Sequence, residues 1–503
     1  MREKIKGVVK FAAFAICLGL LIHWIDRTVV IKYMYDHSEP QTLTYEGFYN
    51  MKKESVDVLI MGTSQAAAGF NPQDLYNARQ IRSYNLASSA QPVWLTYYWL
   101  KEALNYQKPS VVVFDCNYMF SDRIYEDSCR RALDYMRWGR TKTEAVRAVV
   151  EYDIYADENM LSYVFPFFRF HERWKEFDEW DFNWADFSGT PSPLKGFWYY
   201  DGHDQNTDYE LFTDAPADPD SAVFNERSEE YLDKIYSLCQ DNGIELILVK
   251  TPYHVFTKAH HEQVASWAEK NKVPFIDFNE EELVQATGFD YHAGDINDVG
   301  EGNGHVNFSG ARKLSTYLAD YIADNHYAES TFDEQWETSR AFNDAMYHNF
   351  ELTGTEDLEK YLGMLREDRY AVVISAKRGY DRTLSDRAVE ELRSLGLDET
   401  LCDGLQKDSG KSYLAVIDRG KVLHEELSEQ NIYFSCSIRN NLVRLEAILR
   451  GSGSSGSSVI TFDEVEQEKN SLGLNIVVYD YDRRRVIDAV NFAIGDSDLT
   501  CSR

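Results

Sequence analysis

The chain is poor in basic residues, and this deficit excludes one broad class of function. Its 503 residues include 52 Lys plus Arg against 83 Asp plus Glu, which gives a formal net charge of −31. No run of Lys or Arg offsets this charge locally, so phosphate backbones would be repelled. We therefore expect no nucleic-acid partner.

Cysteine is also sparse and shows no metal-binding spacing. The seven Cys residues are scattered along the chain and include no C-x-x-C pair. Structural zinc sites use closely spaced Cys and His ligands, and a disulfide framework needs a regular set of Cys. We predict no zinc site and no essential disulfide, and we expect catalysis to need neither a metal ion nor an organic cofactor.

Long apolar runs are absent except for one near the N-terminus. Residues 11–22 carry no charge, and with their flanks they reach about the 17 residues that a bilayer span requires. We expect a single-pass transmembrane anchor over 8–25. The basic residues before it place 1–7 in the cytoplasm and both later domains outside the cell membrane. A cleaved signal peptide and a buried core helix are the alternatives.

Beyond a connector over 26–50, strand-like runs alternate with helical patterns. Nearly continuous aliphatic and β-branched runs occur at 56–62, 110–117, 244–252 and 273–278. Strands buried on both faces need such runs, and helices between them imply parallel crossovers. The sequence therefore predicts a doubly wound α/β sheet in a domain over 51–340, with ligands at the carboxyl ends of its strands.

Two regions depart from this alternation. Residues 120–225 are dense in aromatic and charged side chains, and we interpret them as a cap inserted in the α/β domain. From about 350, short strands separated by turn residues, with one helix, indicate a second domain over 350–495 that is a β-rich α+β fold.

The first strand-like run leads directly into Gly62, Thr63 and Ser64. A serine hydroxyl becomes a nucleophile only when a base takes its proton and donors await the oxyanion. The second glycine of the α/β-hydrolase nucleophile elbow is absent from GTSQA. Two interpretations stay open: Ser64 is a nucleophile at a strand end, or Thr63 or Ser64 caps the next helix.

The most suggestive histidine lies far downstream, in GEGNGHVNFSGARKLSTYLADYI (300–322). His305 occupies a Gly/Asn-rich loop directly before an amphipathic helix that can close the sheet. Such a loop would project the imidazole over a strand-end face, although a single loop histidine is more often solvated surface. His254 is a rival base at another strand end, but it lacks this loop and helix.

Five segments, in this order, resemble the SGNH hydrolase superfamily, and in particular its membrane-anchored branch of teichoic-acid D-alanylation and alginate O-acetylation proteins. The segments are VLIMGTSQAAAGFNPQDL, YNLASSAQP, VVVFDCNYMF, LILVKTPYHV and GHVNFSGARKLS, which cover roughly 50–325. The resemblance implies a flavodoxin-like α/β/α domain with Ser64 as the nucleophile and His305 as the general base.

The sequence departs from that superfamily at the acid that orients the histidine. The acid usually stands three residues before the histidine, and here that residue is Gly302. The loop GDINDVGEGNGH looks expanded, so we prefer Asp298 as the acid, with Asp295 and Glu301 as alternatives. A Ser-His dyad without a carboxylate is a further alternative, because losing that partner weakens control of the tautomer without abolishing the reaction.

The resemblance also indicates groups around the nucleophile. The oxyanion hole would use the Ser64 amide and the amide of Ser88 or Ser89, where the superfamily commonly has a glycine. Asn117 stands near the superfamily's asparagine, but the motif reads FDCN here, so a role in shaping the floor of the site is the alternative. For Asp115, the alternative is that it satisfies loop amides at the strand end.

In the cap, FRFHERW (168–174) brings His171 and Arg173 among aromatic side chains. One interpretation is a substrate-contacting patch in which Arg173 meets an anionic group and the aromatics stack on sugar faces. The other is an aromatic mini-core with solvated charges.

Segments of 350–495 resemble the interleukin-like EMT inducer domain. They include SYLAVIDRGKVLHEE and GLNIVVYD, the latter followed by a charged turn and VIDAVNF. The resemblance implies a compact, non-catalytic module that binds carbohydrate or protein.

These observations predict a membrane-anchored, extracytoplasmic serine esterase or O-acyltransferase that acts on a cell-surface glycan or glycopolymer. A membrane-bound acyl donor is an expected further partner. The alternative is a catalytically inactive scaffold that binds carbohydrate in the cell envelope, and the missing acid before His305 is its best support.

Overall fold

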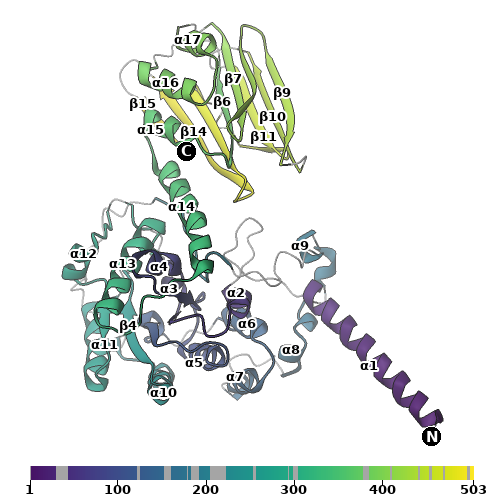
Figure 1. Cartoon of the computed structure of the whole chain (residues 1–503), viewed down its shortest axis with the longest axis vertical. Coiled ribbons are helices and arrows are strands. Elements are labelled where there is room, and N and C mark those ends of the chain that lie inside the picture. The colour runs from purple at the N-terminus through teal and green to yellow at the C-terminus, as the bar shows by residue number, and fades with distance from the viewer. Residues whose placement is uncertain are drawn as a thin grey trace. The chain divides into compact units, whose positions relative to one another are not determined.

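The chain divides into two compact units, residues 1–344 and 345–503, and each is considered by itself (Figure 1). The computed structural model describes residues 2–29, 44–121, 125–151, 160–170, 172–177, 179–182, 192–203, 222–252, 256–292, 294–297, 304–377, 384–407, 410–439, 442–451, 456–467, 469, 471–494 and 499–503. The predicted second domain, 350–495, falls within the second unit.

The helices (α, and η for 3-10) and strands of the first unit are α1 (Arg2–Val29), α2 (Thr44–Asn50), β1 (Val58–Met61), α3 (Ser64–Gly69), α4 (Pro72–Arg79), β2 (Ser83–Asn85), α5 (Val93–Ala103), β3 (Val111–Asp115), η2 (Cys116–Tyr118), α6 (Glu126–Tyr135), α7 (Arg140–Glu151), α8 (Met160–Val164), η3 (Pro166–Phe168), η4 (Arg173–Lys175), α9 (Glu179–Phe182), α10 (Glu226–Asn242), β4 (Glu245–Lys250), α11 (Lys258–Asn271), β5 (Phe275–Asp277), α12 (Glu281–Thr287), α13 (Phe308–Asp324) and the first part of α14 (Glu334–Gly354).

Five parallel strands form the sheet of the first unit, in the order β2-β1-β3-β4-β5. This confirms the predicted α/β class with a parallel sheet. Four of the strands lie in the aliphatic runs that predict them, and every residue of β1 and β3 is buried. β2 was not predicted, because its three residues, Ser83–Asn85, are too short and too polar to show a strand pattern.

The strand order places helices on both faces of the sheet. α13 packs against α3 and α4, and α5 packs against α7 and α10, as right-handed crossovers in this order require. The connections after β1 and β3 leave in opposite directions, which opens a crevice between the carboxyl ends of these two strands. Ser64 follows β1, and Asn117 follows β3.

The described part of the predicted cap, 120–225, belongs partly to the body of the unit. Cys129 and Leu133 of α6, and Val146 and Val149 of α7, are buried in the same core cluster as the sheet residue Leu59. Their apolar side chains recur at helical spacing, so α6 and α7 form a wall of the core rather than a separate lid.

α1 is the one helix of the described chain that is long and apolar enough to cross a membrane. Its span is Ile5–Val29, near the N-terminus, and an 18-residue window within it has a mean hydropathy of 2.1. A membrane anchor and a signal sequence both have these properties.

The second unit consists of the last part of α14, α15 (Leu358–Met364), β6 (Tyr370–Ala376), α16 (Asp386–Ser394), α17 (Glu399–Lys407), β7 (Ser412–Asp418), β8 (Lys421–Ser428), β9 (Ile432–Ile438), β10 (Val443–Arg450), β11 (Ser457–Phe462), β12 (Val465–Glu466), β13 (Leu474–Asp480), β14 (Arg485–Ile494) and β15 (Leu499–Ser502).

Two antiparallel sheets form the core of the second unit. Their orders are β15-β14-β13-β6-β7-β8 and β12-β11-β10-β9. Val373 and Val477 of the larger sheet share an apolar cluster with Leu445 and Ile460 of the smaller one. Ile374 and Ile476 point into a second cluster with α15, α16 and α17. Successive side chains along the strands of the larger sheet therefore point alternately toward the smaller sheet and toward the helices.

Candidate active site

Ser64 is the first residue of α3, directly after β1. Gly62 has φ of +141°, and a Cβ at this position would lie 2.6 Å from Cβ of Asp115, so glycine lets β1 end this close to β3. Thr63 caps α3, and its Oγ1 accepts a hydrogen bond from the Gln65 amide at 3.3 Å. Because Thr63 is the cap, the Ser64 hydroxyl has no capping role.

Small side chains allow α3 to lie directly on the sheet. Residues 66–68 are fully buried alanines, and a Cβ on Gly69 would lie 2.6 Å from Cγ2 of Thr251, which follows β4. At the end of β2, Asn85 Nδ2 donates to the carbonyl of Phe70 at 2.9 Å. The short helix that begins with Ser64 is thus fixed to the strand ends on both sides of it.

The imidazole of His305 meets the hydroxyl of Ser64. His305 Nε2 lies 2.8 Å from Ser64 Oγ, although the residues are 241 positions apart in the chain. An antiparallel bridge between Ile296 and Val306 holds the base of the histidine loop, and the Asn297 amide donates to the His305 carbonyl at 2.8 Å. The fold therefore brings the two predicted residues within hydrogen-bond distance.

Asn307 joins the histidine loop to α13. Its Oδ1 accepts from the Gly310 amide at 3.1 Å as the helix cap, and its Nδ2 donates to the Gly202 carbonyl at 2.9 Å and to the Gly294 carbonyl. One side chain thus ties three separate segments together immediately after His305.

The segment 192–203 forms a wall beside the histidine. The ring centroids of Tyr200 and His305 are 5.3 Å apart, and the Phe308 amide donates to the Tyr200 carbonyl at 3.0 Å. Sequence reasoning missed Tyr200. It is one of 33 Tyr residues, and no local pattern separates it from the others.

The predicted acids fall in two groups. Asp298 and Glu301 lie outside the described residues. Asp295 is buried, and its Oδ2 accepts from Lys313 Nζ at 2.6 Å and from the Asp290 amide at 2.7 Å. These bonds tie the loop to α13, so Asp295 has a structural role that does not involve His305.

The predicted oxyanion donors also differ from one another. Within the described residues, the Ser64 and Ser89 amides have no hydrogen-bond partner. The Ser88 amide donates to the Gly62 carbonyl at 3.2 Å. We therefore correct the prediction for Ser88, because this bond extends the pairing of β1 with β2 and occupies its amide.

Asn117 and Asp115 support the residue before the nucleophile. Thr63 Oγ1 donates to Asp115 Oδ2 at 2.9 Å, and Asn117 Nδ2 donates to Thr63 Oγ1 at 3.4 Å. The Asn117 amide donates to Asp115 Oδ1 at 3.3 Å. Burial raises the pKa of Asp115, and the nearby Lys250 opposes this shift. In this structure both side chains hold Thr63.

Buried charges of alternating sign continue along this edge of the sheet. Lys250 ends β4 and is fully buried, with its Nζ donating to the Thr251 carbonyl at 3.0 Å. Burial lowers the pKa of Lys250, and Asp115 and Asp277 oppose the shift. Asp277 ends β5 and lies 2.7 Å from Nδ1 of His261. Three neighbouring strands thus end in a carboxylate, an ammonium and a carboxylate.

No contact between the remaining candidates and Ser64 is found within the described residues. His171 and the rival base His254 lie outside the described residues. Arg173 Nη1 donates to the Val29 carbonyl at 3.3 Å, and its Nη2 lies 2.6 Å from Asp181 Oδ1. These contacts place Arg173 at the end of α1 and give no support to the predicted contact with substrate. A sequence pattern cannot show that Arg173 pairs with Asp181.

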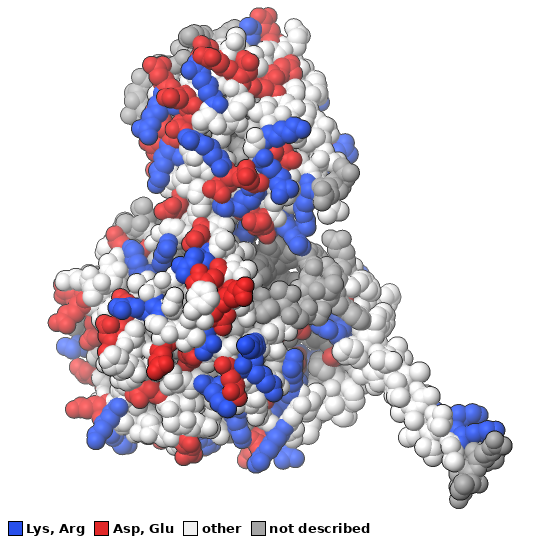
Figure 2. Space-filling model, viewed as in Figure 1, with Lys and Arg blue, Asp and Glu red and all other residues white. Residues whose placement is uncertain are grey.

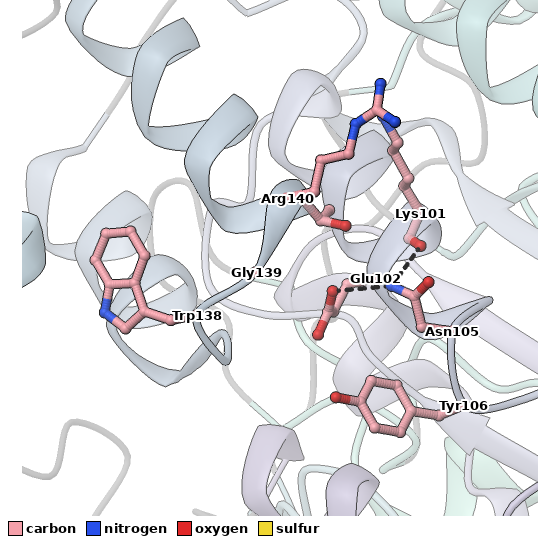
Figure 3. Close-up of a pocket in the computed structure, with 8 residues that line it drawn as sticks. Lys101, Glu102, Asn105, Tyr106, Trp138, Gly139 and Arg140 are labelled. Atoms are coloured by element: carbon pink, nitrogen blue, oxygen red, sulfur yellow. Dashed lines mark hydrogen bonds between the residues drawn. The ribbon is translucent and has the colours of Figure 1, made fainter.

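A surface pocket lies elsewhere on the unit (Figure 3). Because α5 leads into the amino end of β3, this pocket is at the edge of the sheet opposite Ser64. The pocket is lined by Lys101, Glu102, Asn105, Tyr106, Trp138, Gly139, Arg140 and Thr141.

Among the described residues, no group of three His, Cys, Asp or Glu side chains is placed to hold a metal ion.

Comparison with known proteins adds little to this geometry. No protein-family model and no curated protein matches the chain. Among solved structures, the chain is similar to a Bacteroides fragilis protein provisionally described as an acylhydrolase, at 11% identity over 58% of this chain and 100% of that one. The TM-score is 0.26, which is too low to support an inference about fold or function.

Proposed function

We propose that the chain is a serine esterase or O-acyltransferase in which Ser64 is the nucleophile and His305 the general base. The observation that carries this proposal is the 2.8 Å distance between His305 Nε2 and Ser64 Oγ at the carboxyl end of β1. The strand order 2-1-3-4-5 is that of flavodoxin-like sheets, which is the fold that the resemblance to SGNH hydrolases implies.

The proposed reaction has two halves. Ser64 Oγ attacks the carbonyl carbon of an ester while His305 Nε2 takes the hydroxyl proton. The negative charge moves to the former carbonyl oxygen, for which the Ser64 and Ser89 amides are the proposed donors. The intermediate then expels the alcohol, which receives the proton from His305, and an acyl-enzyme remains. Water or an acceptor hydroxyl repeats these steps in reverse order.

Asp298 is the proposed partner of the imidazole on the side away from Ser64. A carboxylate there would fix the tautomer whose Nε2 accepts the proton and would stabilise the imidazolium that forms. Because Asp295 is bonded to Lys313, Asp298 and Glu301 remain as candidates, and we prefer Asp298.

We propose a cell-surface glycan or glycopolymer as the substrate, with the second unit as a carbohydrate-binding module. α1 would anchor the protein with its N-terminus in the cytoplasm, beside a membrane-bound acyl donor. The support is the apolar span Ile5–Val29 and the aromatic wall at Tyr200, which suits the face of a sugar ring.

Turnover of p-nitrophenyl acetate by the detergent-solubilised full chain tests the proposal. We expect Ser64→Ala to reduce turnover to the uncatalysed rate and the neighbouring Ser88→Ala to retain it. With an oligosaccharide added, acetylated sugar would identify a transferase, and acetate alone an esterase. Equal rates for wild type and Ser64→Ala would contradict the proposal and favour the carbohydrate-binding scaffold.

A further inference from the structure

The C-terminal end of α1 is embedded in the first unit. Thr28 is fully buried, and Arg173 Nη1 donates to the carbonyls of Thr28 and Val29 at 3.5 and 3.3 Å. A cation at this end of a helix is favoured by the helix dipole. Arg173 is itself held by the buried carboxylate of Asp181, 2.6 Å away. The direction in which α1 leaves the unit is therefore fixed by the segment around Arg173.

The same segment exposes four large apolar side chains, which we call the collar: Leu161, Phe168, Trp174 and Phe182. They are 61%, 56%, 64% and 55% exposed. η3, which contains Phe168, and α9, which contains Phe182, both contact α1. Figure 1 shows α9 at the inner end of α1 and α8 beside it. Two of the four collar side chains therefore lie on elements that contact α1 where it enters the unit.

The collar is not needed to cover the core of the unit. The ring of Phe168 packs on that of Phe167 with centroids 4.6 Å apart, and the ring of Phe182 packs on that of Phe177 at 5.6 Å. Each pair leaves its outer ring in solvent. A single exposed apolar side chain is ordinary, but a group of large ones in one place marks an interaction surface.

The exposed surface of α1 is continuous with the collar. Figure 2 shows the helix without charge along most of its length, with basic side chains, Lys6 and Lys10, near its N-terminal end. Trp24 is 47% exposed and Thr28 is buried. These two residues are separated by about 6 Å along the helix. The interfacial layer on each side of a bilayer is roughly as thick, about 5–7 Å.

We infer that the collar lies in the interfacial layer of the membrane that α1 enters, so that the first unit rests on lipid through these four side chains. Trp and other large rings are favoured at this depth because part of the ring meets acyl chains while the rest stays hydrated. Lys175, whose Nζ lies 5.7 Å from the centroid of the Trp174 ring and 4.0 Å from Glu172 Oε2, can keep its charge in the hydrated layer while its stem remains among apolar groups. The inference is independent of the proposed chemistry at Ser64.

Site-directed spin labelling tests this inference on the full chain in phosphatidylcholine nanodiscs. The exposed or half-buried Cys17, Cys436 and Cys501 are first replaced by Ala or Ser. Phe168→Cys and Trp174→Cys then carry the nitroxide in separate proteins. Phe332→Cys is the matched control, because Phe332 is 68% exposed in the same unit and lies outside the collar.

We expect labels at 168 and 174 to relax readily with oxygen, which partitions into lipid, and weakly with a water-soluble nickel chelate. The label at 332 should behave in the opposite way. Access of the nickel chelate to 168 and 174 equal to that at 332 would overturn the inference. Protection of both positions from both reagents would also overturn it, since a protein partner or a second copy would then cover the collar. An intact mass showing that α1 is removed in cells would do the same.

Discussion

The second unit and the candidate site of the first unit use buried acidic side chains for different purposes. In the second unit, Asp480 Oδ2 accepts from Asn349 of α14 at 2.6 Å and from Arg369 at 3.3 Å. Asp488 accepts from the Tyr361 hydroxyl of α15 at 2.9 Å and from Arg503 Nε at 3.2 Å. Each buried carboxylate there joins the sheet to a helix or to the end of the chain.

In the first unit, the buried carboxylate of Asp115 instead holds Thr63, the residue before Ser64, and Lys250 lies among the charges behind it. A buried charge is costly unless it is paired, so neither arrangement is incidental. Asp480 and Asp488 therefore support packing in the second unit, whereas Asp115 supports the geometry of the candidate site.

The largest expected effect follows from removing the base. His305→Gln should lower ester turnover by about a thousandfold or more, because His305 is the base that contacts Ser64 Oγ among the described residues. The matched change in the second unit is His424→Gln, at a histidine that stacks on Phe434 with centroids 4.6 Å apart. It should leave turnover unchanged. If His305→Gln turned over the ester at the wild-type rate, as His424→Gln should, then His305 would not be the base of the candidate site.

Neutralising one buried carboxylate in each unit sharpens the comparison. Asp115→Asn should lower kcat by roughly tenfold to a hundredfold with little change in KM, because the loop that carries Ser64 would lose its alignment. Asp488→Asn should leave kcat unchanged and lower the free energy of unfolding by about 3 kcal/mol. Turnover and urea unfolding, measured on both variants, distinguish the two roles. If both variants lost similar stability and neither lost kcat, Asp115 would serve packing alone.

A buried lysine of the first unit predicts a pH dependence of stability. Lys195 Nζ donates to Gln73 Oε1 at 3.1 Å and to the Pro193 carbonyl at 3.2 Å. Burial lowers the pKa of Lys195 from 10.5 to about 7. Between these values the unfolded chain holds a proton that the folded chain lacks, so the free energy of unfolding should rise with pH by up to about 1.4 kcal/mol per unit.

Lys195→Met should flatten that rise between about pH 7 and about pH 9, a range that lies between the folded and unfolded pKa values of Lys195. The exposed Lys270→Met on α11 is the control and should keep the wild-type slope. Urea unfolding at both pH values gives the comparison. An unchanged slope in Lys195→Met would mean that the lysine stays protonated in the folded protein.

The smallest effect concerns one buried serine in each unit. Ser88 Oγ has no hydrogen-bond partner within the described residues, whereas Ser458 Oγ lies 3.2 Å from Ser375 Oγ. Ser458→Ala should therefore cost about 1 kcal/mol of unfolding free energy, and Ser88→Ala less than that. The reverse order in thermal unfolding would indicate an additional partner for Ser88.

Much of the first unit could be predicted from sequence because strands buried on both faces leave nearly continuous apolar runs. β2 escaped because Ser83–Asn85 is paired through its backbone, which carries no sequence signal. Ser64 and His305 could be singled out because Ser64 follows Gly62 at a strand end and His305 lies in a Gly/Asn-rich loop before a helix. Their contact at 2.8 Å depends on the fold as a whole.

Two predicted site residues make other contacts, for a common physical reason. The Ser88 amide is occupied by the Gly62 carbonyl because of the register between β1 and β2. Arg173 is occupied by Asp181 and the end of α1 because of how the predicted cap packs. A sequence reveals which groups can donate a hydrogen bond. Which acceptor each one finds is decided by tertiary structure.

Mass mapping of a fluorophosphonate adduct tests the central claim most directly. The phosphonate reacts covalently with an activated serine and leaves ordinary serines unmodified. We predict that the wild-type chain carries one adduct, on the peptide that contains Ser64, and that Ser64→Ala and His305→Gln carry none. An unmodified wild-type protein, or an adduct that persists in Ser64→Ala, would contradict the account.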